Sequence, residues 1–335
     1  MHVSSEAARP PTSLAEHLRS AVPPQEYEGL IESVLPTLID CVADIAQALR
    51  SSHRVVHAGG ANAFGDAQLN VDVVAEERIR AALARCPFVV AASSEEDPVE
   101  RATGAAPGGA SGEQYAVAFD PLDGSSVAAA NWAVGTIVGV WRGRTALARP
   151  PAARLVAAVL AVYGPRTTAF VALRAPGGAP TCVELGVGGA RGGEVLRAQV
   201  RLAGPPPPPL ARYFAPANLR AAAESPRYMA LVAHFARERY TLRYSGGLVP
   251  DVAHALVKGH GIYVSPATAA SPAKLRRLYE LLPLALVVEC AGGRAIDPAD
   301  GRPVMEVPVR DTGETAGLVC GTPEDVEFVK RALLD

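Results

Sequence analysis

The segment Phe119-Asp-Pro-Leu-Asp-Gly-Ser-Ser126 carries more polar chemistry than a turn requires, and it directly follows an apolar run typical of a buried strand. Pro121 fixes its own φ and disfavours a helical conformation at Asp120. Asp120 and Asp123, with the Leu122 carbonyl between them, can then present oxygen atoms to one point. Mg²⁺ prefers oxygen ligands of this kind. The segment therefore predicts a divalent metal site, and the alternative is a type I turn capped by one aspartate.

The end of the same segment has the residue types that hold a phosphate. Gly124 lets the backbone approach a ligand closely, and Ser125 and Ser126 offer hydroxyl and N–H donors. A phosphate bound here would lie next to the predicted cation site.

Three further stretches place acidic residues where a helix or strand is expected to end, as a cation site built from separate segments requires. Asp66 lies in a turn and Asp72 in the first turn of the helix expected to follow, where helix capping is the alternative for both. Glu95 and Glu96 follow the apolar strand expected at 88–92, where a solvated loop is the alternative.

The third stretch contains Glu280. Ser271 and Pro272 form a good N-cap and N1 pair, and Pro283 predicts that the helix ends just before it. Glu280 would then lie in the last turn, where the helix dipole disfavours an anion. A residue held against its local preference is a candidate for function, although surface glutamates at helix ends are common.

Basic and polar residues further along the chain are candidates for the cations and donors that a phosphate bound beside the metal site needs. Arg243 and Tyr244 lie at an expected strand end, followed by glycines that give access. Lys274 and Arg276 lie near the expected helix start, where backbone N–H groups favour an anion. Ordinary surface charge is the alternative for the basic residues. The candidate residues of this group are Asn218, Arg243, Tyr244, Gly246, Lys274 and Arg276.

Alternating helix and strand patterns must position these groups. Apolar residues recur at helical spacing over 27–49, and strand-like runs follow at 134–141, 155–163 and 168–173. Helices and strands also alternate further on, which predicts an α/β fold with alternating helix and sheet layers in two subdomains. The proline tract at 204–209 predicts a stiff spacer. The predicted division is a poorly ordered leader at 1–24, an N-terminal domain with the metal site at 25–203, and a C-terminal α/β domain completing the substrate site at 210–335.

Composition excludes several functional classes. The 335-residue chain is 49% hydrophobic and 20% charged with a formal charge of −2, which gives no signal for binding nucleic acid or an anionic membrane. No apolar run approaches the roughly 20 residues of a membrane span. Five cysteines without CxxC spacing favour a reducing compartment. The first 24 residues lack a secretory apolar stretch and contain acidic residues that transit peptides usually lack, so we expect a cytoplasmic protein, with a plastid as the alternative.

Together these motifs resemble those of the class I fructose-1,6-bisphosphatase family, and the resemblance extends from about residue 28 to the end. The stretches that carry it are 119–126, Gly65-Asp66, Asp72, Ser94-Glu95-Glu96, Arg243-Tyr244 and 274–280. Inositol monophosphatase-like enzymes share a shorter aspartate motif, but the C-terminal groups suited to a second phosphate disfavour that alternative.

Within the family the closer likeness is to sedoheptulose-1,7-bisphosphatases. The stretches that carry this likeness are 62–66, 163–168, 217–221 and 240–252. Segment 54–62 contains no cysteine where plant members carry a redox-active pair, so we do not expect thioredoxin switching by that pair. Nothing in 20–50 matches the family's AMP-binding turn, so we do not expect AMP inhibition by that route.

The resemblance implies hydrolysis of a phosphoric monoester assisted by two or three Mg²⁺ ions, with Mn²⁺ as a substitute. The implied metal ligands are Asp66, Glu95, Glu96, Asp120, the Leu122 carbonyl, Asp123 and Glu280. The implied catalytic residues are Asp66, Asp72 and Glu96. The implied substrate contacts are Asp123, Gly124, Ser125, Ser126, Asn218, Arg243, Tyr244, Gly246, Lys274 and Arg276. The family's arginine reaches in from a neighbouring subunit, which implies a homodimer or homotetramer.

The implied substrate is sedoheptulose 1,7-bisphosphate, hydrolysed at the 1-phosphate in carbohydrate metabolism (the Calvin cycle or a pentose phosphate route). Fructose 1,6-bisphosphate, alone or as a second substrate, is the main alternative, because the two sugars differ by one carbon. A catalytically inactive sugar-phosphate-binding relative is the remote alternative, and it is disfavoured because every acid named above is present.

Overall fold

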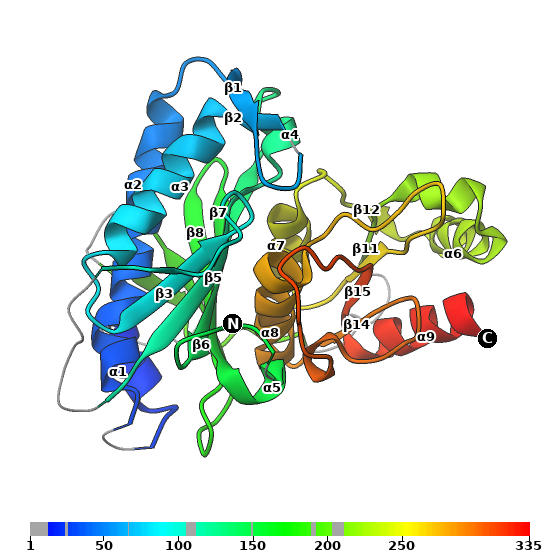
Figure 1. Cartoon of the computed structure of the whole chain (residues 1–335). Coiled ribbons are helices and arrows are strands. Elements are labelled where there is room, and N and C mark those ends of the chain that lie inside the picture. Colours follow the sequence, from blue (N-terminus) through cyan, green and yellow to red (C-terminus); the bar gives the residue numbers. More distant parts are fainter. Residues whose placement is uncertain are drawn as a thin grey trace, which may run out of the picture.

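The computed structural model stacks its elements as helix, sheet, helix, sheet and helix layers (Figure 1). This arrangement confirms the predicted class of layered α/β fold. The structure describes residues 13–23, 26–65, 67–104, 112–148, 150–188, 192–202 and 211–335. The predicted proline spacer lies outside these residues.

The larger sheet, as far as the described residues show, has eight strands in the order β10-β9-β8-β7-β6-β5-β3-β4. Its strands are β3 (Val89–Ser94), β4 (Arg101–Ala102), β5 (Tyr115–Asp123), β6 (Val134–Arg142), β7 (Leu155–Tyr163), β8 (Thr167–Leu173), β9 (Thr181–Gly186) and β10 (Glu194–Arg197). Only β3 and β5 pair in parallel; the other neighbours in this sheet are antiparallel. The central strands are buried on both faces, which explains why they read as continuous apolar runs without alternation.

Helices α2 (Leu35–Ser51) and α3 (Asn70–Leu83) cover one face of this sheet (Figure 1). Between them the chain forms a small hairpin of β1 (His57–Ala61) and β2 (Ala67–Leu69). Two short helices, α4 (Ser125–Ala128) and α5 (Pro151–Arg154), follow β5 and precede β7.

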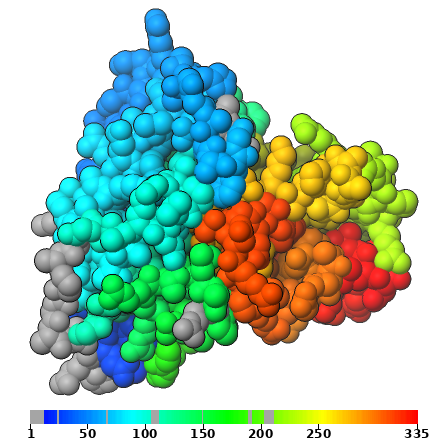
Figure 2. Space-filling view, viewed as in Figure 1, coloured from blue at the N-terminus to red at the C-terminus, as the bar shows by residue number. Residues whose placement is uncertain are grey.

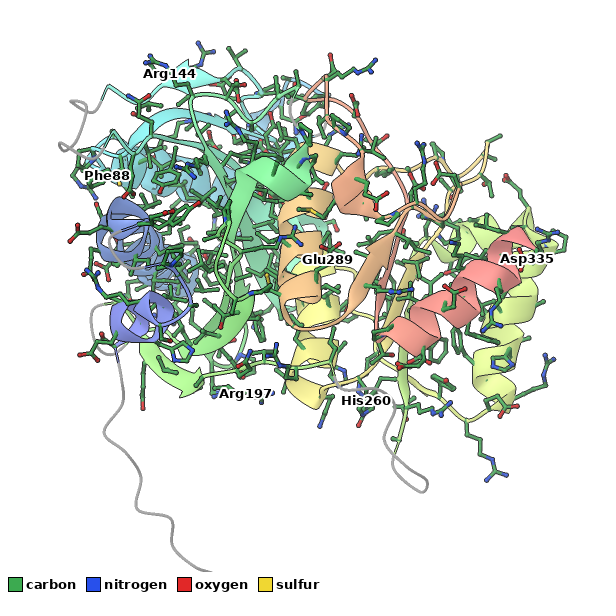
Figure 3. All side chains as sticks on the ribbon, turned by 90° about the horizontal axis from the view of Figure 1, so that it is seen from below. Phe88, Arg144, Arg197, His260, Glu289 and Asp335 are labelled. Carbon is green, nitrogen blue, oxygen red and sulfur yellow. The ribbon has the colours of Figure 1, made fainter. Side chains whose placement is uncertain are left out.

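Helix α8 (Leu282–Cys290) lies between the two sheets, beside α7 (Leu248–Lys258) (Figures 1 and 3). Every α8 residue except Glu289 is buried. Glu289, labelled in Figure 3, forms an ion pair with Arg174, which directly follows β8 of the larger sheet; its Oε2 lies 2.7 Å from Arg174 Nη1. A helix that is apolar around its whole circumference is typical of a buried middle layer.

The smaller sheet, in the part of the chain that the structure describes, has the order β12-β11-β13-β15-β14. Its strands are β11 (Tyr213–Pro216), β12 (Thr241–Leu242), β13 (Ile262–Ser265), β14 (Arg294–Ile296) and β15 (Leu318–Gly321). Helices α6 (Pro226–Arg237) and α9 (Pro323–Leu334) form the outer layer on its far side (Figure 1). The short 3₁₀ turn η2 (Leu219–Ala223) packs against α6, whereas η4 (Val304–Glu306) contacts α8 and α5.

The prediction that a helix ends before Pro283 was wrong. A π-helical turn, η3 (Arg277–Leu281), runs directly into α8, so Pro283 is the second residue of a continuing helix, and the stretch 271–276 is not helical. Proline lacks an N–H group, and its ring clashes with the carbonyl four residues back in an α-helix. A π turn bonds residues five apart and moves that carbonyl away. The turn η1 (Leu30–Val34) precedes Pro36 of α2 in the same way.

The expectation of a poorly ordered leader to residue 24 was wrong for residues 13–23. Helix α1 (Leu14–Arg19) begins with a capping box, in which Ser13 and Glu16 each accept the other's backbone N–H. Leu14 and Leu18 are buried against the core, and this burial anchors the helix.

The N-terminal part (blue to green) and the C-terminal part (yellow to red) meet along a continuous seam in Figure 2. The segment after η4 contacts the N-terminal part there, since Ala148 N donates to Val309 O at 2.8 Å. The ends of β3 and β5 and the beginnings of η3 and α7 lie along the contact between the two parts.

Candidate active site

Three buried or half-buried carboxylates from separate segments converge on one point. Glu95 follows β3, Asp120 lies near the end of β5, and Glu280 lies in η3. One ligand oxygen of each lies within 4.8 Å of the others. Asp120 and Glu280 are only 5% and 6% exposed. These three residues are the part of the predicted ligand set that the structure brings together most closely.

Asp120 lies near the end of β5, where the pairing of β5 with its neighbouring strands becomes irregular. A type I turn was the alternative interpretation of this segment, but β5 continues to Asp123 because β6 still pairs with it across an irregularity in register. The β3 strand has already ended opposite Phe119, so Pro121 need not donate a ladder hydrogen bond on that side. The Leu122 N–H donates to Asp120 Oδ1 at 3.0 Å and fixes the carboxylate.

Glu280 lies in the first turn of its helix and not in the last turn, so the predicted conflict with the helix dipole is absent. The Arg276 backbone N–H donates to the Glu280 carboxylate. This position favours an anion by roughly 0.3–1 kcal/mol, so the local structure orients Glu280 toward the cluster without strain.

The carboxylates of this cluster repel one another and are largely removed from solvent. Burial first, and then the charges of Glu95, Glu280 and Asp123, raise the pKa of Asp120 well above its usual range. Burial and the charge of Glu95 likewise raise the pKa of Glu280. Arg276 is the basic group beside the cluster, with its Nε 3.6 Å from Glu95 Oε1 and its guanidinium 3.8 Å from the Phe64 ring centre. Three carboxylates with buried oxygen donors fit Mg²⁺ or Mn²⁺.

A second acidic group lies next to the first. Asp72 is 3% exposed, and its Oδ2 accepts the Leu69 N–H at 2.8 Å, while Oδ1 is buried without a hydrogen-bond partner among the described residues. Burial, with a smaller contribution from the charge of Glu96, raises the pKa of Asp72 to about 7. Gln68 Nε2 donates to Glu96 Oε2. A carboxyl group with a pKa near neutrality suits proton transfer. The predicted ligand Asp66 lies outside the described residues.

Asp123 connects the end of β5 to the C-terminal part. Its two carboxylate oxygens accept the N–H groups of Leu248 and Val249 at 2.9 and 2.6 Å, at the start of α7. Burial raises the pKa of Asp123 to about 6. The predicted ligand Asp123 therefore has both oxygens engaged by backbone donors, and it is not one of the three residues whose oxygens converge within 4.8 Å.

Two family models match the chain. The fructose-1-6-bisphosphatase N-terminal domain matches residues 18–184, and the C-terminal domain of the same family matches residues 208–334. A class 1 fructose-1,6-bisphosphatase of Trichlorobacter lovleyi is 31% identical over 96% of this chain and 96% of its own length. This chain belongs to the fructose-1,6-bisphosphatase family.

Other members of the family are also similar over most of the chain. The chloroplastic sedoheptulose-1,7-bisphosphatase of Chlamydomonas reinhardtii is 37% identical over 89% of this chain and 71% of its own length. A solved structure from Toxoplasma gondii, described as a candidate sedoheptulose-1,7 bisphosphatase, superposes with a TM-score of 0.82 at 36% identity, covering 96% of this chain and 98% of its own. The holo fructose-1,6-bisphosphatase of Leishmania major gives a TM-score of 0.78 at 25% identity, covering 97% and 99%.

The phosphate-binding residues expected in this family member follow Asp123 directly. Gly124 has a φ of 79°, and a Cβ added there would lie 3.0 Å from the Gly247 Cα, so the two backbones approach too closely for a side chain. Ser125 is half-buried at the start of α4, and Ser126 is exposed. The donors therefore lie at the seam where α7 begins.

The residues predicted for the far end of the substrate have different environments. Arg243, Tyr244 and Lys274 are exposed, and the Arg243 guanidinium lies 5.6 Å from the Tyr213 ring centre. Asn218 instead holds a loop: its amide donates to Pro266 O at 2.8 Å and Ser271 O at 3.0 Å, and it accepts the Ser271 hydroxyl. The Asn218 side chain is thus already used within the fold.

Sequence reasoning missed Asp251, which fixes the loop that carries Gly246. Asp251 Oδ1 accepts the Ser245 N–H at 2.6 Å and the Ser245 hydroxyl at 2.7 Å, while Oδ2 accepts the Gly246 N–H at 3.2 Å. Asp123 engages the next donors of the same segment, at Leu248 and Val249. An aspartate in the first turn of a predicted helix was the available signal, but it is also typical of ordinary capping.

The cysteines and the lengths of the helices can be compared with the composition of the chain. All five cysteines are free and buried. No helix among the described residues combines the length and apolarity needed to cross a bilayer.

Proposed function

We propose that this chain is a Mg²⁺-dependent sugar-bisphosphate phosphatase that hydrolyses the 1-phosphate of sedoheptulose 1,7-bisphosphate, giving sedoheptulose 7-phosphate and phosphate. The observation that carries the proposal is the convergence of Glu95, Asp120 and Glu280, because buried carboxylates so close together need a divalent cation. The sedoheptulose bisphosphatases cited above and their chloroplast counterparts support the seven-carbon substrate at 34–37% identity.

The bound metal ions would neutralise the scissile phosphate and the leaving oxygen and would lower the pKa of a bound water. Two or three Mg²⁺ ions, or Mn²⁺ in their place, are proposed, with Glu95, Asp120 and Glu280 as the main ligands. Glu96, the Leu122 carbonyl, Asp123 and Asp66 complete the proposed ligand set.

The residues of the chain would then bind the substrate and move the proton. Asp72, with one buried oxygen without a hydrogen-bond partner among the described residues, accepts the proton of the attacking water, and Glu96 lies close enough to influence its charge. The N–H and hydroxyl groups of Gly124, Ser125 and Ser126 hold the scissile phosphate.

The proposed contacts to the sugar and its second phosphate come from basic and polar residues of the C-terminal part, of which Arg243, Tyr244 and Lys274 are exposed and Asn218 and Arg276 are half-buried. They are Asn218, Arg243, Tyr244, Gly246, Lys274 and Arg276. We propose a homodimer or homotetramer in which Arg243 serves a neighbouring copy, and the exposure of Arg243 and Tyr244 is compatible with that arrangement. The proposed compartment is the cytoplasm, and a plastid is the second candidate because the sedoheptulose bisphosphatases in the comparison are chloroplastic by name.

Fructose 1,6-bisphosphate is the second candidate substrate, because class 1 fructose-1,6-bisphosphatases match at 30–33% identity over at least 88% of the chain. Phosphate release should be measured on both bisphosphates across a Mg²⁺ titration, and we expect the higher kcat/KM on the seven-carbon sugar. A tenfold preference for the six-carbon sugar would replace the substrate assignment. No release from either sugar, with Mg²⁺ or Mn²⁺, would favour an inactive binding relative.

A further inference from the structure

Behind the metal-ligand turn, α3 carries a largely buried ion pair that the proposed chemistry does not use. Arg80 Nε lies 2.5 Å from Glu76 Oε1, one helical turn apart, and the two side chains are only 28% and 14% exposed. Pairs of this spacing usually lie in solvent and contribute only a few tenths of a kcal/mol. Burial of both partners suggests a different use for this pair.

The pair contacts both ends of the turn that presents Glu95 and Glu96. The Ser94 hydroxyl donates to Glu76 Oε1 at 2.9 Å. Arg80 Nη2 donates to Asp97 O at 3.4 Å and lies 3.6 Å from Asp97 Oδ2.

The turn itself closes on the same two residues. The Asp97 N–H donates to Ser94 Oγ at 2.9 Å, and the Ser94 N–H donates to Asp97 O at 3.0 Å. Glu95 and Glu96 are the two residues between them, so their backbone position depends on where α3 holds Ser94 and Asp97.

The same pair reaches the other acid-bearing segments. The Arg80 guanidinium lies 5.7 Å from the Phe119 ring centre, and Phe119 O accepts the Glu95 N–H at 3.1 Å. Asp120 follows Phe119 directly. Asp72 lies one turn before Glu76 on the same helix. The side chains of Glu76 and Arg80 therefore contact both the 94–97 turn and β5, and fix the positions of these two segments relative to α3.

We propose that Glu76 and Arg80 are positioning residues that set the geometry of Glu95 and Glu96 for a divalent cation. The inference rests on the proposed metal-dependent function, because it assigns a role toward the same site. Groups that orient metal ligands typically change metal affinity 10- to 100-fold when removed. Glu76 and Arg80 have opposite charges, so the pair orients the ligands without adding net charge to the acidic cluster.

The test is a Mn²⁺ binding titration of the metal-stripped full-length protein, followed by the electron paramagnetic resonance of free Mn²⁺. We expect Glu76→Ala and Arg80→Met to weaken Mn²⁺ binding at least tenfold. Glu76→Gln keeps an acceptor for Ser94 and Arg80, so it should stay within about threefold of wild type. Glu77→Ala and Arg78→Met are matched controls on the exposed side of α3 and should stay within twofold.

Kinetics give a second readout that a purely structural role would not produce. The half-saturating Mg²⁺ concentration should rise in Glu76→Ala and Arg80→Met, while the KM for the sugar bisphosphate at saturating Mg²⁺ should change less than twofold. Folded variants that bind Mn²⁺ like wild type would overturn the inference, even if their melting temperature falls. If the alanine and methionine variants do not fold, Arg80→Lys replaces them, because lysine keeps the charge but loses the planar guanidinium group. Arg80→Lys should weaken Mn²⁺ binding more than Glu76→Gln does. Equal Mn²⁺ affinities of these two variants would overturn the inference.

Failure of the proposed function gives a different result. In that case wild-type protein binds Mn²⁺ but hydrolyses neither bisphosphate, and the comparison of the Glu76 and Arg80 variants still decides the inference. A wild-type protein that binds no Mn²⁺ overturns the inference itself.

Discussion

Replacing Asp120 with asparagine should change the stability of the metal-free protein and its response to Mg²⁺ in opposite directions. Asparagine keeps an acceptor for the Leu122 N–H, so the local turn survives. It removes the charge that repels Glu95 and Glu280. We therefore expect Asp120→Asn to be more stable than wild type without metal at pH 8, and less responsive to added Mg²⁺.

The magnitude follows from the geometry. At a separation of 4.8 Å and an effective dielectric constant of 20, two unit charges repel by about 3.5 kcal/mol. Partial protonation relieves some of this repulsion in wild type, which leaves a gain of about 1–3 kcal/mol for the variant. For a chain of this length that corresponds to a rise in melting temperature of roughly 1.5–4 °C. Saturating wild type at 100 times its Kd for Mg²⁺ should add about 2.7 kcal/mol, most of which the variant should lose.

The change in stability of the metal-free protein with pH provides a second, independent test. The pKa values of Asp120 and Glu280 are higher in the folded state than in the unfolded chain, so the folded state binds more protons. The stability that these two groups contribute should therefore be greatest below the ordinary carboxyl pKa, near 4, and should be lost as the pH rises through the raised values. The fall should be shallower in Asp120→Asn, and Mg²⁺ should reverse it in wild type.

Differential scanning calorimetry with EDTA and with Mg²⁺ measures both effects. Asp325→Asn is the matched control, because Asp325 in the first turn of α9 is 8% exposed and accepts the hydroxyl of Thr322, the N-cap residue of that helix. That variant should lose stability and keep the full Mg²⁺ response. The reasoning is refuted if Asp120→Asn melts below wild type in EDTA, or if it retains the whole Mg²⁺-induced shift.

Three further substitutions separate the roles of neighbouring residues. Asp72→Asn should lower kcat by about 10²–10⁴ with little change in KM. Because a base must be ionised to act, wild-type activity should rise through pH 7, and an unchanged acid limb in the variant would exclude Asp72 as the base. Gly124→Ala should lower activity at least tenfold without changing Mn²⁺ affinity, because its Cβ meets Gly247 at a positive φ; wild-type kinetics would show that the seam can relax. Asp251→Asn should raise KM for the bisphosphate without changing the half-saturating Mg²⁺ concentration, since it loses an acceptor for the Gly246 N–H; an unchanged KM would exclude Asp251 from substrate positioning.

The sequence predicted the acids of the site because their local signals are strong. Asp120 and Asp123 flank a proline and precede a glycine and serines, a combination that a plain turn does not need. Glu95 follows an apolar strand whose pairing with β5 brings it beside Asp120. Both signals lie within a few residues, so they can be recognised without knowledge of the fold.

The residues that support the acids could not be predicted in this way. The pair Glu76 and Arg80 has the spacing of any exposed helical ion pair, and only its placement against β3 distinguishes it from Glu77 and Arg78. Asp251 likewise has the position of an ordinary helix-capping acid. In each case the function comes from contacts with segments distant in sequence, which local propensity does not encode.

The error at Glu280 has a specific physical origin, and it changes how the site is understood. A proline usually predicts a helix end, but the π turn before Pro283 allows the helix to continue and places Glu280 at its start. The Arg276 N–H then fixes Glu280, as the Leu122 N–H fixes Asp120 and Phe119 O fixes the Glu95 backbone. The carboxylates of Asp120 and Glu280 are thus held by backbone donors, and the main chain of Glu95 is held by Phe119 O, independently of a cation. The cluster stores its unfavourable energy as repulsion between fixed charges, and a divalent ion that enters it can relieve that repulsion without reorganising the ligands.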